Sequence, residues 1–210
     1  MSLKPYKTLM ARGEAEFIVN KSRFIGYGAP VSSEEEAQDF LKQIRARHKD
    51  ASHNCYAYIV GANMGIMRYS DDGEPGGTAG LPIIEVMKAQ AVTNAAVVVT
   101  RYFGGVLLGA GGLTRAYAQG AAEALRAAGV GEMHPTARYL VELPYPLLDR
   151  ALHFLKDKPV SIDDKAFAEA VTLTLRVKTV DQALVTEELA QALDGRVEPL
   201  FVDETYLPWA

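Results

Sequence analysis

Glycine is concentrated in two short segments of this chain, and each segment separates a predicted strand from a predicted helix. Nine of the 18 glycines fall within residues 71–80 and 104–112. Glycine loses more backbone entropy on folding than any other residue, so this clustering indicates unusual dihedrals or a ligand close to the backbone. Tight turns at strand ends are the simpler explanation. Both interpretations indicate a fold in which strands and helices are joined by tight glycine-rich turns.

The hydrophobic pattern of the first 130 residues predicts strands and helices in mixed order. Continuous or alternating apolar runs predict strands at 14–19, 23–31, 54–60, 65–70 and 95–102. A first helix is expected after Ser33, because Ser33 and Glu36 have the spacing of a capping box. A second helix of about ten residues contains Ile83, and an alanine-rich helix follows the second glycine segment and ends near residue 128.

The last 75 residues have a different organisation, after a predicted linker at 133–137. The expected elements are a strand at 139–143, a helix at 146–156, strands at 160–165 and 170–178, a helix at 181–193 and a strand at 197–206. This βαββαβ order is typical of ferredoxin-like domains. The sequence therefore predicts an α+β protein with two domains, residues 1–133 and 138–207.

Composition and charge exclude several classes of protein. Cys55 is the single cysteine, which rules out an internal disulfide framework and a zinc site built from several cysteines. No apolar run approaches the ~20 residues of a membrane-spanning helix, and the N-terminus lacks a secretory pattern, so we expect a cytoplasmic protein that does not bind membranes. Residues 1–135 carry 14 Lys and Arg against 13 Asp and Glu, whereas residues 136–210 carry 8 against 13. Any nucleic-acid contact must then use a local patch on the first domain.

The second glycine segment predicts an anion-binding site. A strand, a glycine loop and a helix start present free backbone N–H groups and the positive end of the helix dipole to an anion, and two arginines flank the loop. The candidate anion-binding residues are Arg101, Gly104, Gly105, Gly109, Gly111, Gly112 and Arg115. The P-loop motif fails because Ala110 and Gly111 replace its Lys and Ser/Thr, and the dinucleotide fingerprint fails at Thr114.

The first glycine segment carries three carboxylates within four residues. Asp71, Asp72 and Glu74 suit a hard cation such as Mg²⁺, and His53 joins them if the fold brings it near. Alternatively, the two aspartates cap or turn the chain and Glu74 is solvated. Cys55 shares a strand face with His53, but a buried core cysteine is commoner than a catalytic one. We predict no cofactor.

Several segments resemble the IMPACT family, of the bacterial YigZ type. The motifs that carry the resemblance are Lys21-Ser22-Arg23-Phe24, His53-Asn54-Cys55-x-Ala57-Tyr58, Ser70-Asp71-Asp72-Gly73-Glu74-Pro75-x-Gly77-Thr78-Ala79-Gly80, Val99-Thr100-Arg101-Tyr102-Phe103-Gly104-Gly105 and Leu108-Gly109-x-Gly111-Gly112-Leu113-x-Arg115-Ala116-Tyr117. They add candidate site residues within these motifs, namely His53, Asp71, Asp72, Glu74, Thr78 and Tyr102. One departure is Leu107, where many eukaryotic relatives carry Lys.

The resemblance implies a first domain with the α/β sandwich fold shared by a ribosomal protein domain, elongation factor G domain IV and GHMP-type kinases. It implies a ferredoxin-like second domain similar to elongation factor G domain V. Eukaryotic relatives regulate translation by competing for an activator of a translation-initiation-factor kinase. A shared fold alone does not establish function.

Two functional hypotheses follow from the sequence. In the first, the protein is a non-catalytic binding module that presents the second glycine loop to RNA phosphate, a ribosomal component or a translation-related protein. In the second, the carboxylate loop binds a divalent metal and the glycine loop binds a phosphorylated small molecule, which gives a hydrolase or phosphotransferase. The first hypothesis is preferred because no complete catalytic constellation is visible.

Overall fold

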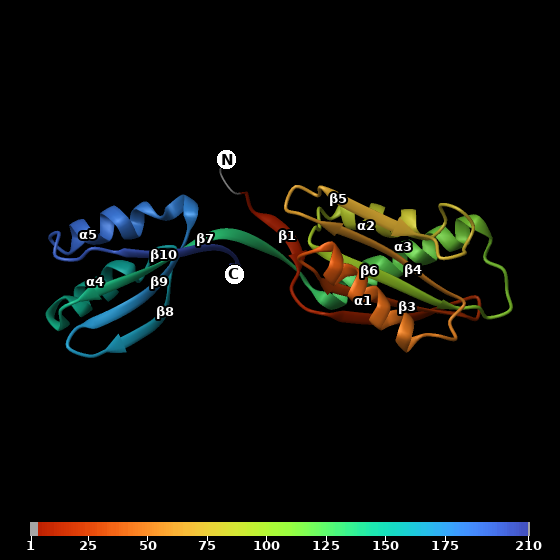
Figure 1. Ribbon diagram of the computed structural model, residues 1–210, viewed down its shortest axis with the longest axis horizontal. Coiled ribbons are helices and arrows are strands. Elements are labelled where there is room, and N and C mark those ends of the chain that lie inside the picture. Colours follow the sequence, from red (N-terminus) through yellow and green to blue (C-terminus); the bar gives the residue numbers. More distant parts are fainter. Residues whose placement is uncertain (1–3, 210) are drawn as a thin grey trace. The chain divides into compact units, whose positions relative to one another are not determined.

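The computed structural model describes residues 4–209, which form two compact units (Figure 1). The N-terminal unit is Pro5–Glu132, and the C-terminal unit begins at Met133. The first three residues of the predicted domain 1–133 lie outside the described part of the chain. Each unit has its own sheet and its own buried core, so the chain is an α+β protein as predicted.

The N-terminal unit contains one antiparallel sheet and three helices. Its strands are β1 (Tyr6–Leu9), β2 (Gly13–Val19), β3 (Ser22–Pro30), β4 (His53–Val60), β5 (Ile66–Ser70) and β6 (Ala95–Tyr102), and its helices are α1 (Glu34–Arg47), α2 (Gly80–Ala89) and α3 (Gly109–Ala128). The sheet order is β2-β3-β6-β4-β5, and β1 is not part of this sheet, because it pairs with β7 (Val130–Leu143). The structure adds β1, which the sequence did not predict, and confirms the other elements to within a few residues.

Helices cover both faces of this sheet, with α1 on one face and α2 and α3 on the other (Figure 1). The central strand β6 is therefore buried on both sides, which explains its continuous apolar run. Val97 and Val99 pack in the core beneath α2 and α3, whereas Ala96 and Val98 pack beneath α1. By the same alternation, Arg101 points toward α3.

The C-terminal unit has the strand and helix order that the sequence predicts. Its elements are β7 (Val130–Leu143), η1 (Tyr145–Leu147), α4 (Leu148–Leu155), β8 (Val160–Phe167), β9 (Val171–Lys178), η2 (Thr179–Asp181), η3 (Leu184–Glu188), α5 (Leu189–Ala192) and β10 (Leu200–Pro208). The strands lie in the order β10-β7-β9-β8, and each neighbouring pair is antiparallel.

Two expectations for this half were wrong. Residues 133–137, expected to be a linker, belong to strand β7, where Thr136 and Ala137 pair with β9. The single helix expected at 181–193 is divided into a 3-10 turn, a π-helical segment and a short α-helix. Its buried residues Val185, Leu189 and Leu193 recur every four positions, so they still lie on one face across the divided segment.

No helix in residues 4–209 is long and apolar enough to cross a membrane.

Candidate functional site

The two glycine-rich loops meet at one pocket of the N-terminal unit. The pocket has a volume of about 440 Å³ and is lined by His53, Gly73, Glu74, Pro75, Arg101, Phe103, Leu107, Leu108, Gly109, Ala110 and Leu113. His53 and Arg101 are paired neighbours on β4 and β6, so their side chains lie on the same face of the sheet. Glu74 comes from the loop after β5, and Gly109 and Ala110 begin α3.

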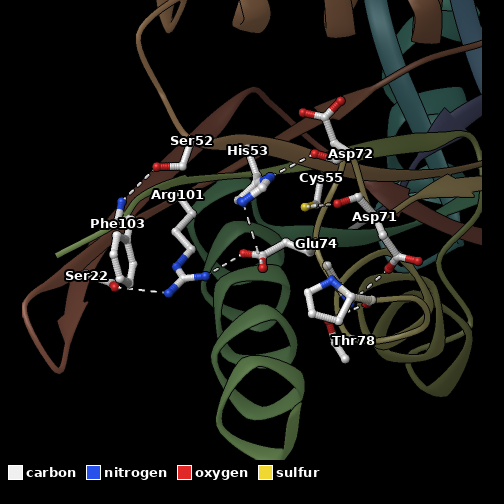
Figure 2. Close-up of polar contacts among 12 residues, drawn as sticks. Ser22, Ser52, His53, Cys55, Asp71, Asp72, Glu74, Thr78, Arg101 and Phe103 are labelled. Atoms are coloured by element: carbon white, nitrogen blue, oxygen red, sulfur yellow. Dashed lines mark hydrogen bonds and ion pairs between the residues drawn. The ribbon is translucent and has the colours of Figure 1, made fainter. Parts of the chain in front are cut away.

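A buried ion pair forms the floor of the pocket. Arg101 is 4% exposed, and its Nη1 donates to Glu74 Oε1 at 2.7 Å. The Tyr117 hydroxyl of α3 donates to the same oxygen at 2.7 Å. Figure 2 shows Glu74 joined both to Arg101 and to His53. Because a buried charge needs a partner, these contacts hold both charges in place.

This geometry corrects the expectation for Arg101. We expected its guanidinium to hold an external phosphate or carboxylate, but it pairs with an internal acid instead. Its remaining surroundings are also internal, since Nη2 donates to Ser22 Oγ at 3.3 Å and the guanidinium lies against the rings of Phe24 and Phe103. Arg101 Nε is buried without a hydrogen-bond partner among the described residues. The role of Arg101 is therefore structural: it holds residues of the pocket together through contacts within the chain.

His53 lies beside Arg101 in the pocket and faces the other carboxylate oxygen of Glu74. Its Nδ1 lies 2.8 Å from the backbone carbonyl oxygen of Asp72, and its Nε2 lies 3.9 Å from Glu74 Oε2. A carbonyl oxygen only accepts hydrogen bonds, so Nδ1 carries a proton. Nε2 faces the Glu74 carboxylate at the distance of an ion pair.

The alternative of a metal site at the three carboxylates is not supported, because the carboxylates have separate partners. Asp71 accepts hydrogen bonds from the backbone N–H groups of Gly77, Ala79 and Gly80 at 2.8–3.0 Å and so caps the start of α2. Asp72 accepts from Arg45 Nη2 and from the N–H of Asn54. Among residues 4–209, no three His, Cys, Asp or Glu side chains are grouped as metal ligands. Glu74 is buried, contrary to the alternative that it is solvated.

Two further candidates lie outside the pocket. Thr78 Oγ1 donates to the Pro75 carbonyl at 2.7 Å, which closes the turn before α2. Tyr102 is on the opposite face of the sheet, where its hydroxyl lies 2.8 Å from His48 Nδ1. Both residues support the fold around the pocket without lining it.

The glycines of the second loop divide into two groups. Gly104 has no room for a Cβ because the backbone of Lys21 lies against it. Gly105 and Gly109 have φ values of +81° and +68°, a backbone geometry that disfavours other residues. Gly111 and Gly112 lie in the first turn of α3. The glycines therefore shape the loop and let a ligand approach the helix end.

The first turn of α3 is open at its N-terminus. Its N-cap residue Leu108 provides no side-chain hydrogen bond to the turn. Arg115 is exposed and makes no hydrogen bond or ion pair with any residue in the described part of the chain. A Cβ placed on Gly111 would lie 3.8 Å from Arg115 Nη1, so this guanidinium lies beside the first turn. Unsatisfied amides, a helix dipole and a cation thus occupy the same place.

Cys55 is unsuited to nucleophilic chemistry. It is fully buried, and its Sγ donates to the Asp71 carbonyl oxygen at 3.0 Å. Burial raises the pKa of the thiol to about 12, so almost no thiolate is present at neutral pH. Cys55 is therefore a core residue, as the simpler of the two interpretations of the sequence predicts.

Sequence reasoning missed the residues that complete the pocket. Tyr117 and Ser22 hold the ion pair, and both belong to motifs of the family resemblance, which was the available signal. The apolar walls come from Phe103, Leu107, Leu108 and Leu113. Leu107 is 85% exposed, which the sequence alone does not indicate.

Comparison with known proteins identifies relatives over the whole chain. Residues 20–125 match the family model described as Impact N-terminal domain, and residues 141–196 match a domain of unknown function (DUF1949). The chain is 37% identical over 205 residues to "IMPACT family member YvyE" of Bacillus subtilis (strain 168), which covers 98% of this chain and 94% of that protein. It is 35% identical over 191 residues to "IMPACT family member YigZ" of Escherichia coli (strain K12), with coverages of 89% and 92%. A solved structure described as "Crystal structure of an hypothetical protein" has a TM-score of 0.62 and 31% identity, and covers 96% of this chain and 99% of that chain.

Proposed function

We propose, from the premise that this chain belongs to the IMPACT family, that its N-terminal unit is a translation-associated binding module for single-stranded RNA. The observation that carries the proposal is the open N-terminus of α3 beside the exposed Arg115 guanidinium. In this role, the amides of residues 109–112 and Arg115 hold one RNA phosphate.

The walls of the pocket favour RNA over a purely ionic ligand. Phe103 and Leu107 are exposed at the mouth of the pocket, next to the phosphate site. Proteins recognise single-stranded RNA by combining phosphate contacts with bases that stack on aromatic or apolar side chains. In this arrangement the anion site binds the phosphate of a nucleotide, and the adjoining apolar surface stacks on its base.

The charge of the chain limits the size of the interface. The net charge is −4, and residues 136–210 account for the excess of acidic residues. A broad basic surface for the RNA backbone is therefore missing from the sequence, and the contact proposed here involves one or two phosphates.

We also infer the two folds that the family resemblance implies. The strand order β10-β7-β9-β8 with all-antiparallel neighbours supports a ferredoxin-like C-terminal unit. The layered N-terminal unit supports the sandwich fold of a ribosomal protein domain and elongation factor G domain IV. These likenesses support an association with translation only by analogy. The metal-dependent hydrolase or phosphotransferase is not favoured, because Asp71, Asp72 and Glu74 have other partners.

Fluorescence anisotropy with a short labelled single-stranded RNA of mixed sequence tests the proposal. We expect Arg115→Ala to weaken binding about tenfold, because it removes a charged phosphate contact. Arg126→Ala is the matched control, since Arg126 is an exposed arginine at the other end of α3 and is paired with Glu123. Equal loss in both variants, or no binding by the wild type, would refute the proposal. Binding of an acidic peptide in place of RNA would indicate a protein partner.

A further inference from the structure

A groove of about 540 Å³ lies on the C-terminal unit, and the proposed function does not use it. Helices α4 and α5 pack on one face of this sheet, where alternate residues of β7 and β9 such as Val141 and Leu173 are buried. Because side chains alternate across a strand, the groove residues of β7 and β9 lie on the opposite face. The residues that line the groove are Leu140, Glu142, Thr172, Glu198, Pro199 and Leu200.

An exposed apolar pair forms one part of the groove. Leu200 of β10 lies directly opposite Leu140 of β7 in the antiparallel register, and Leu200 is 64% exposed. Pro199 lines the groove next to Leu200. A partner that covers this pair with an apolar side chain removes apolar surface from water, which stabilises the complex.

Two carboxylates lie at the same end of this apolar pair. Glu142 follows Leu140 by two residues on β7. Glu198 precedes Leu200 by two residues, and because β7 and β10 are antiparallel, both steps run in the same direction. Both glutamates are exposed, and neither makes a hydrogen bond or ion pair with any residue among 4–209. Like charges on neighbouring strands repel, so a cation between them relieves a repulsion and gains two ion pairs.

We propose that this groove binds an extended basic peptide of a partner protein. An apolar side chain of the peptide covers Leu140 and Leu200. An arginine or lysine two positions further along the peptide lies between Glu142 and Glu198. Residues two apart in an extended chain point to the same side and are about 7 Å apart. Leu140 and Glu142 are also two positions apart on a strand, so the peptide and the groove have the same spacing.

The charge of the groove favours a basic polypeptide over a nucleic acid. Two unpaired carboxylates repel phosphate groups, and residues 136–210 carry 13 Asp and Glu against 8 Lys and Arg. The same charges attract a cationic partner and accelerate its association. The groove belongs to the C-terminal unit alone, and the inference does not depend on the RNA site proposed for the N-terminal unit.

Fluorescence anisotropy of the full-length protein with the labelled nonapeptide Thr-Leu-Thr-Arg-Thr-Leu-Thr-Arg-Thr tests the inference. We expect saturable binding, which Glu142→Gln combined with Glu198→Gln weakens at least about tenfold, because both ion pairs to arginine are lost. The matched control is Glu169→Gln combined with Glu187→Gln, which changes the net charge equally. Both control residues are exposed in the same unit and do not line the groove. Thermal melting verifies that both double variants are folded.

A second comparison tests the apolar contact. Replacing the leucines of the peptide by alanine should weaken its binding to the wild type at least about fivefold. Leu200→Ser should weaken binding of the leucine peptide by a similar factor and change binding of the alanine peptide little. Such non-additivity is expected only when the two leucine positions contact each other.

The outcomes decide the inference without involving the N-terminal unit. No binding of the peptide to the wild type would overturn it. An equal loss in the two double variants would also overturn it, because the attraction would then depend only on overall charge. Weaker RNA binding by the variant with Glu142→Gln and Glu198→Gln would overturn it as well, since this face would then be a nucleic-acid site. The RNA-binding proposal is decided separately by Arg115→Ala and Arg126→Ala.

Discussion

Arg101 and Glu74 show how a single buried contact organises the pocket. The Arg101 and Glu74 side chains are 5% and 3% exposed, respectively, so each charge depends on the other for its neutralisation. A buried ion pair adds little to stability when compared with a well-packed apolar pair, but removing one partner leaves an uncompensated charge. The pair therefore acts as a structural requirement of the folded N-terminal unit.

Glu74→Ala is expected to lower the free energy of unfolding by about 3–5 kcal/mol, because it leaves the Arg101 charge buried and unpaired. Urea denaturation followed by circular dichroism measures the change. Glu85→Ala is the control, since Glu85 pairs with Lys88 on the exposed surface of α2, and its effect should stay within about 1 kcal/mol. A similar loss in the two variants would contradict the buried-pair account.

The position of Arg101 shows what sequence reasoning missed at this scale. The motif placed an arginine before a glycine loop, and we expected it to face a ligand. Strand alternation places Arg101 on the face of Val97 and Val99, toward α3, which was a usable signal. Its partner Glu74 lies 27 residues away in sequence, and no local pattern indicates that pairing.

At the scale of elements, Asp71 defines the start of α2. The N-cap residue Ala79 has no side-chain oxygen, so its orphan amides are satisfied by a carboxylate from the preceding loop. The first glycine segment lets the chain fold back far enough for this contact, with Gly73 and Gly77 at positive φ. The interpretation of Asp71 as a cap was one of the alternatives that the sequence offered.

Asp71→Ala should destabilise the N-terminal unit by at least about 1–2 kcal/mol, the usual cost of losing a helix cap. Asp39→Ala provides the comparison, because Asp39 forms an exposed pair with Lys42 within α1. Chemical denaturation of both variants gives the difference. If the Asp71→Ala and Asp39→Ala proteins have the same free energy of unfolding, the Asp71 cap does not stabilise the unit.

His48 links the end of α1 to the sheet. Its Nε2 lies 2.6 Å from the Tyr27 hydroxyl, and its Nδ1 lies 2.8 Å from the Tyr102 hydroxyl. The Tyr102 hydroxyl donates to Asp50, so it accepts from Nδ1–H, and Nε2 accepts from Tyr27. Burial, together with the charges of Arg47 and Arg23, lowers the pKa of His48 below 6.5. This arrangement requires the neutral imidazole.

Stability should therefore fall as the pH decreases below about 6.5, because the unfolded chain then binds a proton that folded His48 resists. His48→Gln should reduce this dependence of the unfolding free energy on pH. The exposed His153 of α4 supplies the control variant, His153→Gln, which should keep the wild-type slope. An identical slope in wild type and His48→Gln would rule out a buried neutral His48.

For the whole molecule, the sequence predicted the elements better than their arrangement. Apolar runs such as Ala95–Tyr102 and the alternation of Val171–Lys178 indicated strands whose burial the structure confirms. The continuity of β7 through residues 133–137 was missed, because Pro135 and the polar residues around it are typical of a linker. Pairing with β9 and β10 extends the strand there, and such long-range pairing leaves no local pattern.

The charge of the whole molecule predicts a weak dependence of RNA binding on salt. With a net charge of −4 and one free arginine at the proposed site, the slope of log Kobs against log salt concentration should lie between about −0.7 and −1.4. This corresponds to one or two phosphates on a single strand. Anisotropy titrations at several salt concentrations measure the slope. A slope of about −4 or steeper would require a basic surface that differs from the one proposed.

The most direct measurement is an amide NMR titration of the labelled full-length protein with AMP. Phosphate bound at the start of α3 should shift the backbone amide signals of Gly109, Ala110, Gly111 and Gly112 in a saturable way, and Arg115→Ala should weaken this response. Unchanged signals at these four amides, with shifts elsewhere or none, would contradict the claim that the open end of α3 is the binding site.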